Sequence, residues 1–324
     1  MSISVIIPTY NRPEQLINLL EQLDHGSVMP DEVVIINNCS DLIYPNIKLK
    51  NIRPRVIFNS VNVGGVGNVL KCFEEAKSQW MWIIGDDDGV KLDSIEIIRG
   101  DIDLYKEAAT IFYSNYMSPI AKSFLIEKTS DFLKVFDKEK FGGRLWISSA
   151  IYNRKYLKNS IQKMYEFPGS SPQMTWQLIN SNKCCYFSSR EIATHNAPSE
   201  NELWNVLKIQ NQMTQLLMIP DLDSEVRGKL ADALSNWYTG HDETLIRCCM
   251  DYLINKEKPN KESIIFAYAC RYVVAFLAMN KFTAAIEVIK LYQTISNDEN
   301  LIYELAQDYF KKDLKILSNK SFLE

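Results

Sequence analysis

Three consecutive carboxylates follow a strongly apolar stretch of this sequence. Residues 80–84 read Trp-Met-Trp-Ile-Ile, and Gly85 then leads directly into Asp86, Asp87 and Asp88. An apolar run of this kind is typical of a buried strand that carries charge to the edge of a sheet. Because adjacent carboxylates repel one another, they are costly there unless a divalent cation or a cationic ligand lies among them. Their oxygen atoms suit Mg²⁺ or Mn²⁺, and a solvated acidic turn is the competing interpretation.

Two other loops contain residues that could contribute to the same site. Residues 8–13 read Pro-Thr-Tyr-Asn-Arg-Pro and follow the apolar residues 3–7. Gly64, Gly65 and Gly67 lie at the start of a predicted helix. These glycines do not match the dinucleotide-binding pattern GxGxxG, because position 70 is leucine, and the chain has no GxxxxGK[ST] phosphate loop. Taken alone, they are typical of a flexible turn before a helix.

The elements that must position these loops alternate between strands and helices. The predicted strands comprise residues 3–7, 32–36, 55–58, the strand that begins at 80, 110–114, 145–152 and 184–188. The predicted helices comprise residues 13–23, a helix from the glycine loop to about 77, 93–106, and 172–180 with Ser171 as N-cap. Residues 118–143 are expected to form a loop with at most one short helix. This alternation predicts an α/β fold with parallel pairing, right-handed crossovers and ligands at the carboxyl ends of the strands.

The composition is that of a soluble globular protein and lacks the basic excess typical of nucleic-acid binding. Hydrophobic residues make up 46% of the 324 residues and charged residues 23%, and the formal net charge is -4. No basic excess is present to neutralise the phosphates of a duplex. The seven cysteines, odd in number and without CxxC spacing, favour reduced thiols in a cytosolic protein over zinc or disulfides. No signal peptide is expected, since the N-terminus has no basic region and Pro8 interrupts its short apolar run. No transmembrane helix is expected either, since the longest apolar run, residues 264–279, is interrupted by Arg271 and is shorter than a bilayer requires.

The character of the sequence changes after Pro198. Residues 1–198 hold the alternating strands and helices, whereas residues 199–324 show successive helices with few strand signals. Two domains are therefore predicted, and the second is all-helical and of ordinary domain size. The apolar stretch 264–279 in this second domain is expected to be either its core helix or an interface.

Several stretches of the first domain together resemble glycosyltransferase family 2. They are SVIIPTYNRPEQL, EVVIINNCSD, NVGGVGN and WIIGDDDG, in that order, with a weaker segment that ends in REIATHN. The resemblance covers about residues 2–196. It implies the GT-A fold of these inverting enzymes, which is a Rossmann-like, mostly parallel sheet flanked by helices, here followed by a C-terminal all-helical region.

The resemblance also implies roles for individual residues. Those expected to bind the nucleotide sugar are Pro8, Thr9, Tyr10, Arg12, Asn38, Asn62, Gly65, Asn68, Asp86 and Asp87. Pro8, Thr9 and Tyr10 would line the nucleoside pocket, Arg12 would approach the diphosphate, and the glycine loop would close over the nucleotide. Asp86 and Asp88 would be the outer residues of the DXD motif and, with His195, the ligands of Mn²⁺ or Mg²⁺. Asp88 would thereby act in catalysis, because a bound cation neutralises charge on the leaving oxygens.

Two departures from the family pattern concern the nucleobase and the general base. The family usually has aspartate where this chain has Asn37 and Asn38, and an amide can accept a hydrogen bond from uracil or donate one to cytosine. The family's Glu-Asp pair, which supplies the base, falls on Ser170 and Ser171 here. Glu166 is the nearest acidic residue and the candidate base.

The activity implied is the metal-dependent, inverting transfer of a sugar from a nucleotide diphosphate, most simply a UDP-sugar, to a hydroxyl of a growing bacterial surface glycan. A glycan of capsule or O-antigen type, or its lipid-linked form, is the expected acceptor of this cytoplasmic enzyme. The helical region would dock the acceptor, a protein partner or the inner face of the membrane. A non-catalytic scaffold that has lost the base is one alternative. A nucleotidyltransferase is another, but it would need a glycine- and arginine-rich loop at residues 8–13.

Overall fold

The structure is a computed structural model, and its contacts divide the chain into two units, Met1–Ile209 and Gln210–Glu324. The residues that it describes are 1–39, 48–116, 118–127, 131, 146–169, 171–195, 214–236, 269–270 and 273–297. The domain boundary predicted from the sequence, after residue 198, lies outside the described residues.

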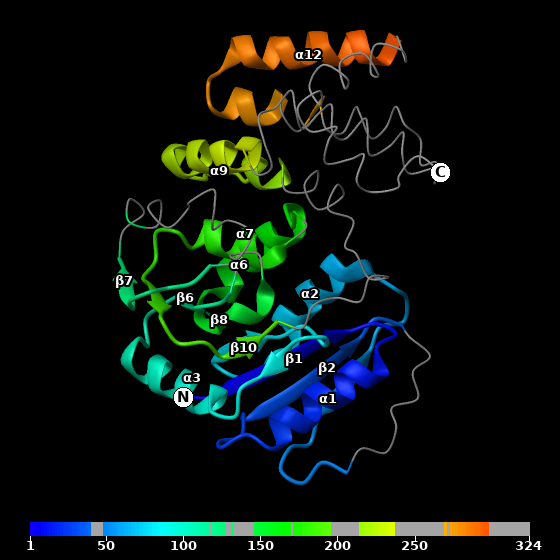
Figure 1. Ribbon diagram of the computed structural model, residues 1–324, viewed down its shortest axis with the longest axis vertical. Helices are drawn as coiled ribbons and strands as arrows, with labels where there is room; N and C mark the ends of the chain where they lie inside the picture. Colours follow the sequence, from blue (N-terminus) through cyan, green and yellow to red (C-terminus); the bar gives the residue numbers. More distant parts are fainter. Residues whose placement is uncertain are drawn as a thin grey trace, which may run out of the picture. The chain divides into compact units, whose positions relative to one another are not determined.

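A sheet of eight strands, counted within the described residues, forms the centre of the first unit (Figure 1). In order across the sheet the strands are β3 (Arg55–Phe58), β2 (Glu32–Asn37), β1 (Ile3–Thr9), β4 (Trp80–Ile83), β8 (Ala150–Asn153), β6 (Thr110–Tyr113), β9 (Cys185–Ser188) and β7 (Phe124–Ile126). The first four are parallel to one another, so their carboxyl ends meet at one edge of the sheet. The loops that follow these four strands are therefore gathered where the sequence predicts a ligand site.

One face of the sheet is covered by α1 (Pro13–Asp24) and α3 (Ser94–Leu104), which share an apolar core with side chains of β1 and β4. The buried stripe of α1 consists of Leu16, Leu19, Leu20 and Leu23, the helical spacing predicted from the sequence. Pro13 occupies the first turn, where a missing N–H is not needed for the helix.

The opposite face is covered by α2 (Gly64–Glu75), α6 (Leu157–Glu166) and α7 (Pro172–Ile179), which contact one another. Three aromatic rings pack at their centre. Phe73 of α2 stacks on Trp176 of α7 with centroids 5.6 Å apart, and Tyr152 of β8 meets both rings edge-on. Both faces of the sheet are thus buried, which explains why the strands read as nearly continuous apolar runs.

Within the described residues, the sheet combines four parallel and three antiparallel pairs of strands, and its elements β8 and β7, like helix α6, differ from those predicted from the sequence. In place of a strand over residues 145–152, Ile147–Ser149 forms a 3₁₀ turn, η1, and β8 then pairs antiparallel with both β4 and β6. β7 lies in the segment predicted to be a loop and pairs antiparallel with β9. Helix α6 has no predicted counterpart, because its sequence buries only Leu157, Ser160 and Met164 and so lacks a broad apolar stripe.

A short antiparallel ribbon joins two parts of the first unit that are far apart in the sequence. β5 (Gly89–Val90) pairs with β10 (Ala193–Thr194), with Gly89 opposite Thr194. A Cβ atom on Gly89 would overlap the Thr194 hydroxyl, so any other residue at position 89 would require the Thr194 side chain to move. The pairing places the residue after Thr194, His195, next to the residue before Gly89, Asp88.

The second unit, taken by itself, is helical in its described residues. It contains the 3₁₀ turn Thr214–Met218 (η4) and the helices α9 (Ser224–Asn236) and α12 (Phe282–Asn297) (Figure 1). The helical character predicted for the C-terminal region is confirmed there. Within the apolar stretch 264–279, the described Ala269, Ala275 and Phe276 are buried. Among the residues that the structure describes, no helix combines the length and the hydropathy needed to cross a bilayer.

Candidate functional site

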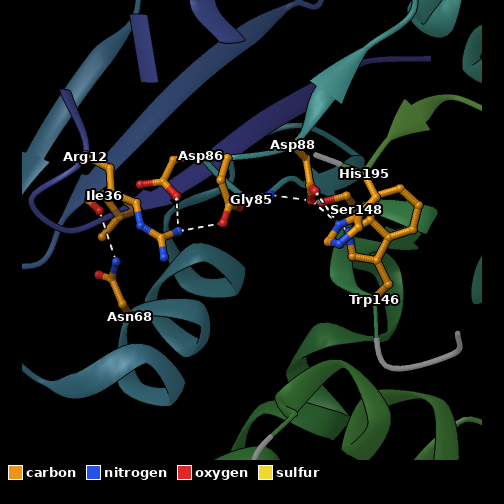
Figure 2. A network of polar contacts seen from close by, with 10 residues as sticks. Arg12, Ile36, Asn68, Gly85, Asp86, Asp88, Trp146, Ser148 and His195 are labelled. Carbon is orange, nitrogen blue, oxygen red and sulfur yellow. Dashed lines mark hydrogen bonds and ion pairs between the residues drawn. The ribbon is translucent and has the colours of Figure 1, made fainter. Parts of the chain in front are cut away.

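The acidic triplet, Asp86 to Asp88, is partly neutralised by a side chain of the protein itself. Nη1 of Arg12 donates to Oδ1 of Asp86 at 3.2 Å and to Oδ2 of Asp87 at 2.7 Å (Figure 2). Arg12 lies in the loop after β1, whose carboxyl end adjoins that of β4. The side chain of Arg12 is 22% exposed and that of Asp86 only 6%, so solvent screens this ion pair weakly. The cationic partner that the triplet needs is thus supplied, for two of its members, by Arg12.

Asp86 retains a carboxyl oxygen without a partner. Its Oδ2 atom is buried and makes no hydrogen bond within the described residues, and the neighbouring Thr9 hydroxyl is also buried without one. Burial raises the pKa of Asp86 to about 6, and the charge of the nearby Arg12 guanidinium opposes this rise. Because a buried polar atom without a partner is unfavourable, this oxygen would favour a polar or cationic ligand group.

Asp88 accepts hydrogen bonds from two donors that were not predicted from the sequence. Its Oδ2 atom accepts a hydrogen bond from Nε1 of Trp146 at 2.8 Å and one from Oγ of Ser148 at 2.5 Å (Figure 2). Burial raises the pKa of Asp88, and these two hydrogen bonds oppose the rise. Trp146 and Ser148 lie in the segment predicted to be a strand, and neither its spacing nor its composition indicates a role at a site.

His195 lies beside the other oxygen of Asp88. Its Nδ1 atom is 3.3 Å from Oδ1 of Asp88 (Figure 2). The imidazole ring stacks on Tyr116, with centroids 5.2 Å apart, and meets the ring of Trp146 edge-on at 5.7 Å. Two aromatic rings therefore restrict the position of the imidazole, and the β5–β10 ribbon supplies the backbone position from which it reaches Asp88.

The arrangement fits a divalent cation that shares its ligands with a phosphate. Among the described residues, no group of three or more His, Cys, Asp or Glu side chains is placed to hold a metal ion, so the predicted set of Asp86, Asp88 and His195 is not a ready-made cage. Asp88 and His195 do offer two ligands. Adjacent ligands of an octahedral ion at about 2.1 Å lie about 3 Å apart, close to the 3.3 Å seen between Nδ1 and Oδ1. Two protein ligands are also typical where phosphate oxygens and water complete the shell.

The residues predicted to face the nucleoside lie around the carboxyl ends of β1 and β2. Pro8 and Thr9 end β1, and the carbonyl oxygen of Thr9 accepts from the backbone N–H of Asn38 at 3.0 Å. Tyr10 follows with a side chain that is 46% exposed, and Gly65 is exposed in the first turn of α2. The structure gathers these residues at one edge of the sheet, and their contact with a nucleoside stays a prediction.

Asn38 is engaged in shaping the glycine loop. Its Oδ1 atom accepts from Nδ2 of Asn59 at 3.1 Å and from the backbone N–H of Val63 at 2.9 Å, and its Nδ2 donates to Oδ1 of Asn62 at 2.8 Å. The same Asn62 oxygen accepts from the N–H of Gly64. A side chain that makes three hydrogen bonds to the segment between β3 and α2 has little capacity left to read a base.

Asn68, on α2, forms hydrogen bonds to β2 and to the residue that follows β3. Its Oδ1 accepts from Nδ2 of Asn59 at 2.9 Å, and its Nδ2 donates to the carbonyl oxygen of Ile36 at 3.1 Å (Figure 2). Asn68 is buried in the second turn of α2, so these bonds anchor the helix to the end of β2. Asn59 was not among the predicted residues, because its role depends on contacts with side chains from three other segments.

Replacing Asn38 by aspartate is expected to lower the free energy of unfolding by about 1–3 kcal/mol, because a carboxylate cannot donate to the Asn62 oxygen and would face it instead. Urea denaturation measures this change. The exposed Asn18, whose Oδ1 only accepts a bond from Gln22, serves as a control, since Asn18→Asp keeps its acceptor. A shift in nucleobase preference without loss of stability would instead assign Asn38 to base recognition.

Among the described residues, the hydrogen bond of the candidate base lies within its own helix and does not involve the acidic triplet. Glu166 is exposed at the end of α6, and its Oε1 accepts from Gln162 of the same helix at 2.8 Å. Of the two residues that replace the family's acidic pair, Ser170 lies outside the described residues. Ser171 is buried at the N-cap position of α7, but its hydroxyl makes no capping bond and no other hydrogen bond within the described residues. A catalytic role for Glu166 therefore stays a prediction.

Comparison with known proteins identifies relatives by sequence. Residues 4–172 match the family described as Glycosyl transferase family 2. An uncharacterized glycosyltransferase from Bacillus subtilis, YwdF, is 31% identical over 104 residues, which is 32% of this chain and 39% of YwdF. The abequosyltransferase RfbV of Salmonella typhimurium is 33% identical over 112 residues, 32% of this chain and 33% of RfbV. The matched region thus spans between a third and two fifths of each of these relatives.

Solved structures share the fold. Residues 1–349 of S. aureus TarS in complex with UDP-GlcNAc superpose with a TM-score of 0.58 at 14% identity, covering 91% of this chain and 92% of that one. The mannosyltransferase PcManGT of Pyrobaculum calidifontis, solved with GDP-Man and Mn²⁺, gives a TM-score of 0.51 at 13% identity, covering 98% and 88%. At these identities the likeness concerns the fold, and it confirms the GT-A architecture expected from the sequence.

Proposed function

The chain belongs to glycosyltransferase family 2, and on that premise we propose that it transfers a sugar from a nucleotide diphosphate donor to an acceptor hydroxyl, with inversion at the anomeric carbon. The observation that carries this proposal is the acidic triplet at the carboxyl end of β4, where Asp88 adjoins His195 and Arg12 pairs with the other two carboxylates. Carboxylate, imidazole and guanidinium groups at one sheet edge suit a ligand that combines phosphate with a divalent cation.

In the proposed reaction the acceptor oxygen bonds to the anomeric carbon while the bond from that carbon to the diphosphate oxygen breaks. The nucleoside diphosphate leaves with the bonding electrons, and the acceptor proton passes to a base, for which Glu166 is the candidate. Asp88 and His195 would hold Mn²⁺ or Mg²⁺, which when bound supplies positive charge to the leaving oxygens. Arg12 would add a fixed positive charge at the same edge and keep Asp86 and Asp87 in place.

The donor that we propose is a UDP-sugar. TarS was solved with UDP-GlcNAc, whereas PcManGT was solved with GDP-Man, so donors with different bases occur among proteins of this fold. The asparagine residues 37 and 38 in this chain replace the aspartate usual in the family, and a test of the donor should therefore include all common nucleobases.

The acceptor that we propose is a hydroxyl of a growing bacterial surface glycan, reached by a cytoplasmic enzyme at the inner face of the membrane. Docking of the acceptor, or of the lipid or protein that carries it, is assigned to the second unit. One face of α12 supports this role, since Phe282, Ile286 and Ile289 follow one another at helical spacing and are 58%, 52% and 42% exposed.

Release of nucleoside diphosphate from a panel of UDP-, GDP-, CDP- and dTDP-sugars, with Mn²⁺ present, tests the proposal. Slow release with water as acceptor and faster release with a glycan acceptor are the expected results. Nucleotide binding without release from any donor would favour a non-catalytic subunit, which the exposed position of Glu166 and the serine at position 171 also motivate. Release of pyrophosphate from a nucleoside triphosphate and a sugar phosphate would identify a nucleotidyltransferase.

Replacing His195 by alanine is expected to raise the Mn²⁺ concentration for half-maximal activity by about 10- to 100-fold, because one of two protein ligands is lost. A metal titration of the initial rate measures this shift. His25 is the matched control, since its ring bonds only to the carbonyl oxygen of Glu21 on α1, and His25→Ala should leave the titration unchanged. Identical titrations for His195→Ala and the wild type would remove His195 from the metal site.

A further inference from the structure

The hydrogen bonds on Asp88 are distributed unevenly between its two oxygens. Oδ2 accepts from both Trp146 and Ser148, and so uses the two acceptor positions that a carboxylate oxygen provides. Oδ1 has only the contact with Nδ1 of His195 among the described residues. The carboxyl group is therefore oriented, with one oxygen saturated by the protein and the other directed to the imidazole (Figure 2).

The hydroxyl and the carbonyl oxygen of Ser148 are both hydrogen-bonded. Its hydroxyl donates to Asp88 and accepts from the backbone N–H of Gly85 at 2.9 Å, and its carbonyl oxygen accepts from Nε1 of Trp82 at 2.9 Å. The residue is fully buried. A Cβ atom on Gly85 would lie 2.9 Å from Oδ2 of Asp88, so a larger residue at position 85 would displace this carboxyl group. The turn η1 thus locks the side chain of Asp88 to the end of β4.

Trp146 connects Asp88 to His195. Its N–H donates to Asp88, while its ring meets the imidazole edge-on at 5.7 Å and the Tyr116 ring at 6.4 Å. The Tyr116 ring also stacks on the imidazole of His195, with centroids 5.2 Å apart. One indole therefore restrains both groups that would bind a cation, although they come from strands far apart in the sequence.

We propose that Trp146 and Ser148 are positioning residues that hold Oδ1 of Asp88 and Nδ1 of His195 at the separation of two adjacent ligands of one divalent cation. The inference rests on the proposed function. Beyond that function, it assigns the preorganisation of the cation site to Trp146 and Ser148, at the turn before β8. The acidic triplet and His195 alone would not hold the two ligands at this separation. Preorganisation of this kind raises affinity because the ion need not order its ligands on binding.

The test is the affinity of the full-length protein for Mn²⁺ in the presence of UDP, measured by electron paramagnetic resonance, which does not require turnover. Trp146→Phe keeps a ring but removes the N–H, and Ser148→Ala removes the hydroxyl. Each is expected to weaken Mn²⁺ binding by about 10- to 100-fold while leaving UDP binding in excess EDTA unchanged. In the transfer assay, kcat at saturating Mn²⁺ should recover to near the wild-type value.

Two buried residues of the same types serve as controls. The indole N–H of Trp80 and the hydroxyl of Ser118 are buried without a hydrogen bond within the described residues, so Trp80→Phe and Ser118→Ala should leave Mn²⁺ affinity unchanged. Wild-type Mn²⁺ affinity in folded Trp146→Phe or Ser148→Ala would overturn the proposal, as would an equal loss of UDP binding in EDTA. Failure of the proposed function is a separate result, namely no release of nucleoside diphosphate by a wild-type protein that still binds Mn²⁺ with UDP.

Discussion

Asp88→Asn is expected to slow sugar transfer by about 1,000-fold, equivalent to about 4 kcal/mol of transition-state stabilisation, while the chain remains folded. The amide oxygen can still accept the hydrogen bonds of Trp146 and Ser148, so the turn η1 keeps its anchor. The atom that changes is the one directed to His195, where a carboxylate oxygen suited to a cation is replaced by an amide of lower affinity. Initial rates with saturating donor and Mn²⁺ measure the loss.

The stability of the same variant distinguishes a functional carboxylate from a structural one. Burial raises the pKa of Asp88, which means that the ionised group is costly in the protein without metal. A neutral amide should therefore leave the melting temperature without metal unchanged or higher. Asp93→Asn, at an exposed residue before α3 without a capping bond, is the control for both measurements. Full activity of Asp88→Asn, or activity that persists in excess EDTA, would contradict the assignment of Asp88 to a cation site.

Trp176→Ala is expected to lower the free energy of unfolding by about 3–5 kcal/mol, the largest effect on stability that we anticipate. The side chain is fully buried between α2, α7 and β8, stacks on Phe73, and donates from Nε1 to the hydroxyl of Thr110 at 3.0 Å. Its removal leaves a cavity and an unpaired polar group. Urea unfolding followed by circular dichroism measures the loss.

Two further variants serve as references for the loss of stability in Trp176→Ala. Trp176→Phe keeps one aromatic ring and loses the rest of the indole with its N–H, so a smaller loss of stability is expected. Tyr165→Ala removes an aromatic ring that is 47% exposed on α6, and should cost less than about 1 kcal/mol. An unfolding midpoint for Trp176→Ala equal to that of Tyr165→Ala would show that the three-ring cluster contributes little to stability.

The first half of the fold was predictable because its signals are local. Residues 3–7, 32–36 and 55–58 are short apolar runs that end in polar loops, and α1 has a regular leucine stripe, so each element matches its prediction closely. The segment before β8 was not predictable in the same way. Its sequence, LWISSAIYN, suits a strand throughout, and the 3₁₀ turn within it coincides with hydrogen bonds to Asp88 and Gly85, which are distant in sequence.

The residues of the candidate site also fall into those with a local sequence signal and those that depend on tertiary contacts. The acidic triplet and His195 could be located from the sequence by their types and by the family resemblance, and the structure brings Asp88 and His195 together. Arg12 was found, but its pairing with two of the carboxylates could not be, because that pairing is a tertiary contact across 74 and 75 residues. Trp146 and Ser148 act through side-chain hydrogen bonds over 58 and 60 residues, which no local pattern records.

The β5–β10 ribbon determines when this site can form as the chain is synthesised. Asp88 and His195 are 107 residues apart, so the acidic triplet, Arg12 and the turn η1 all leave the ribosome before the histidine does. Closing so long a loop has an entropic cost, which the contacts that form on closure must offset. A nascent chain that stalls before residue 195 would carry the acidic edge without its imidazole. If His195 is a ligand of the cation, tight cation binding would require that the chain has been translated at least through residue 195.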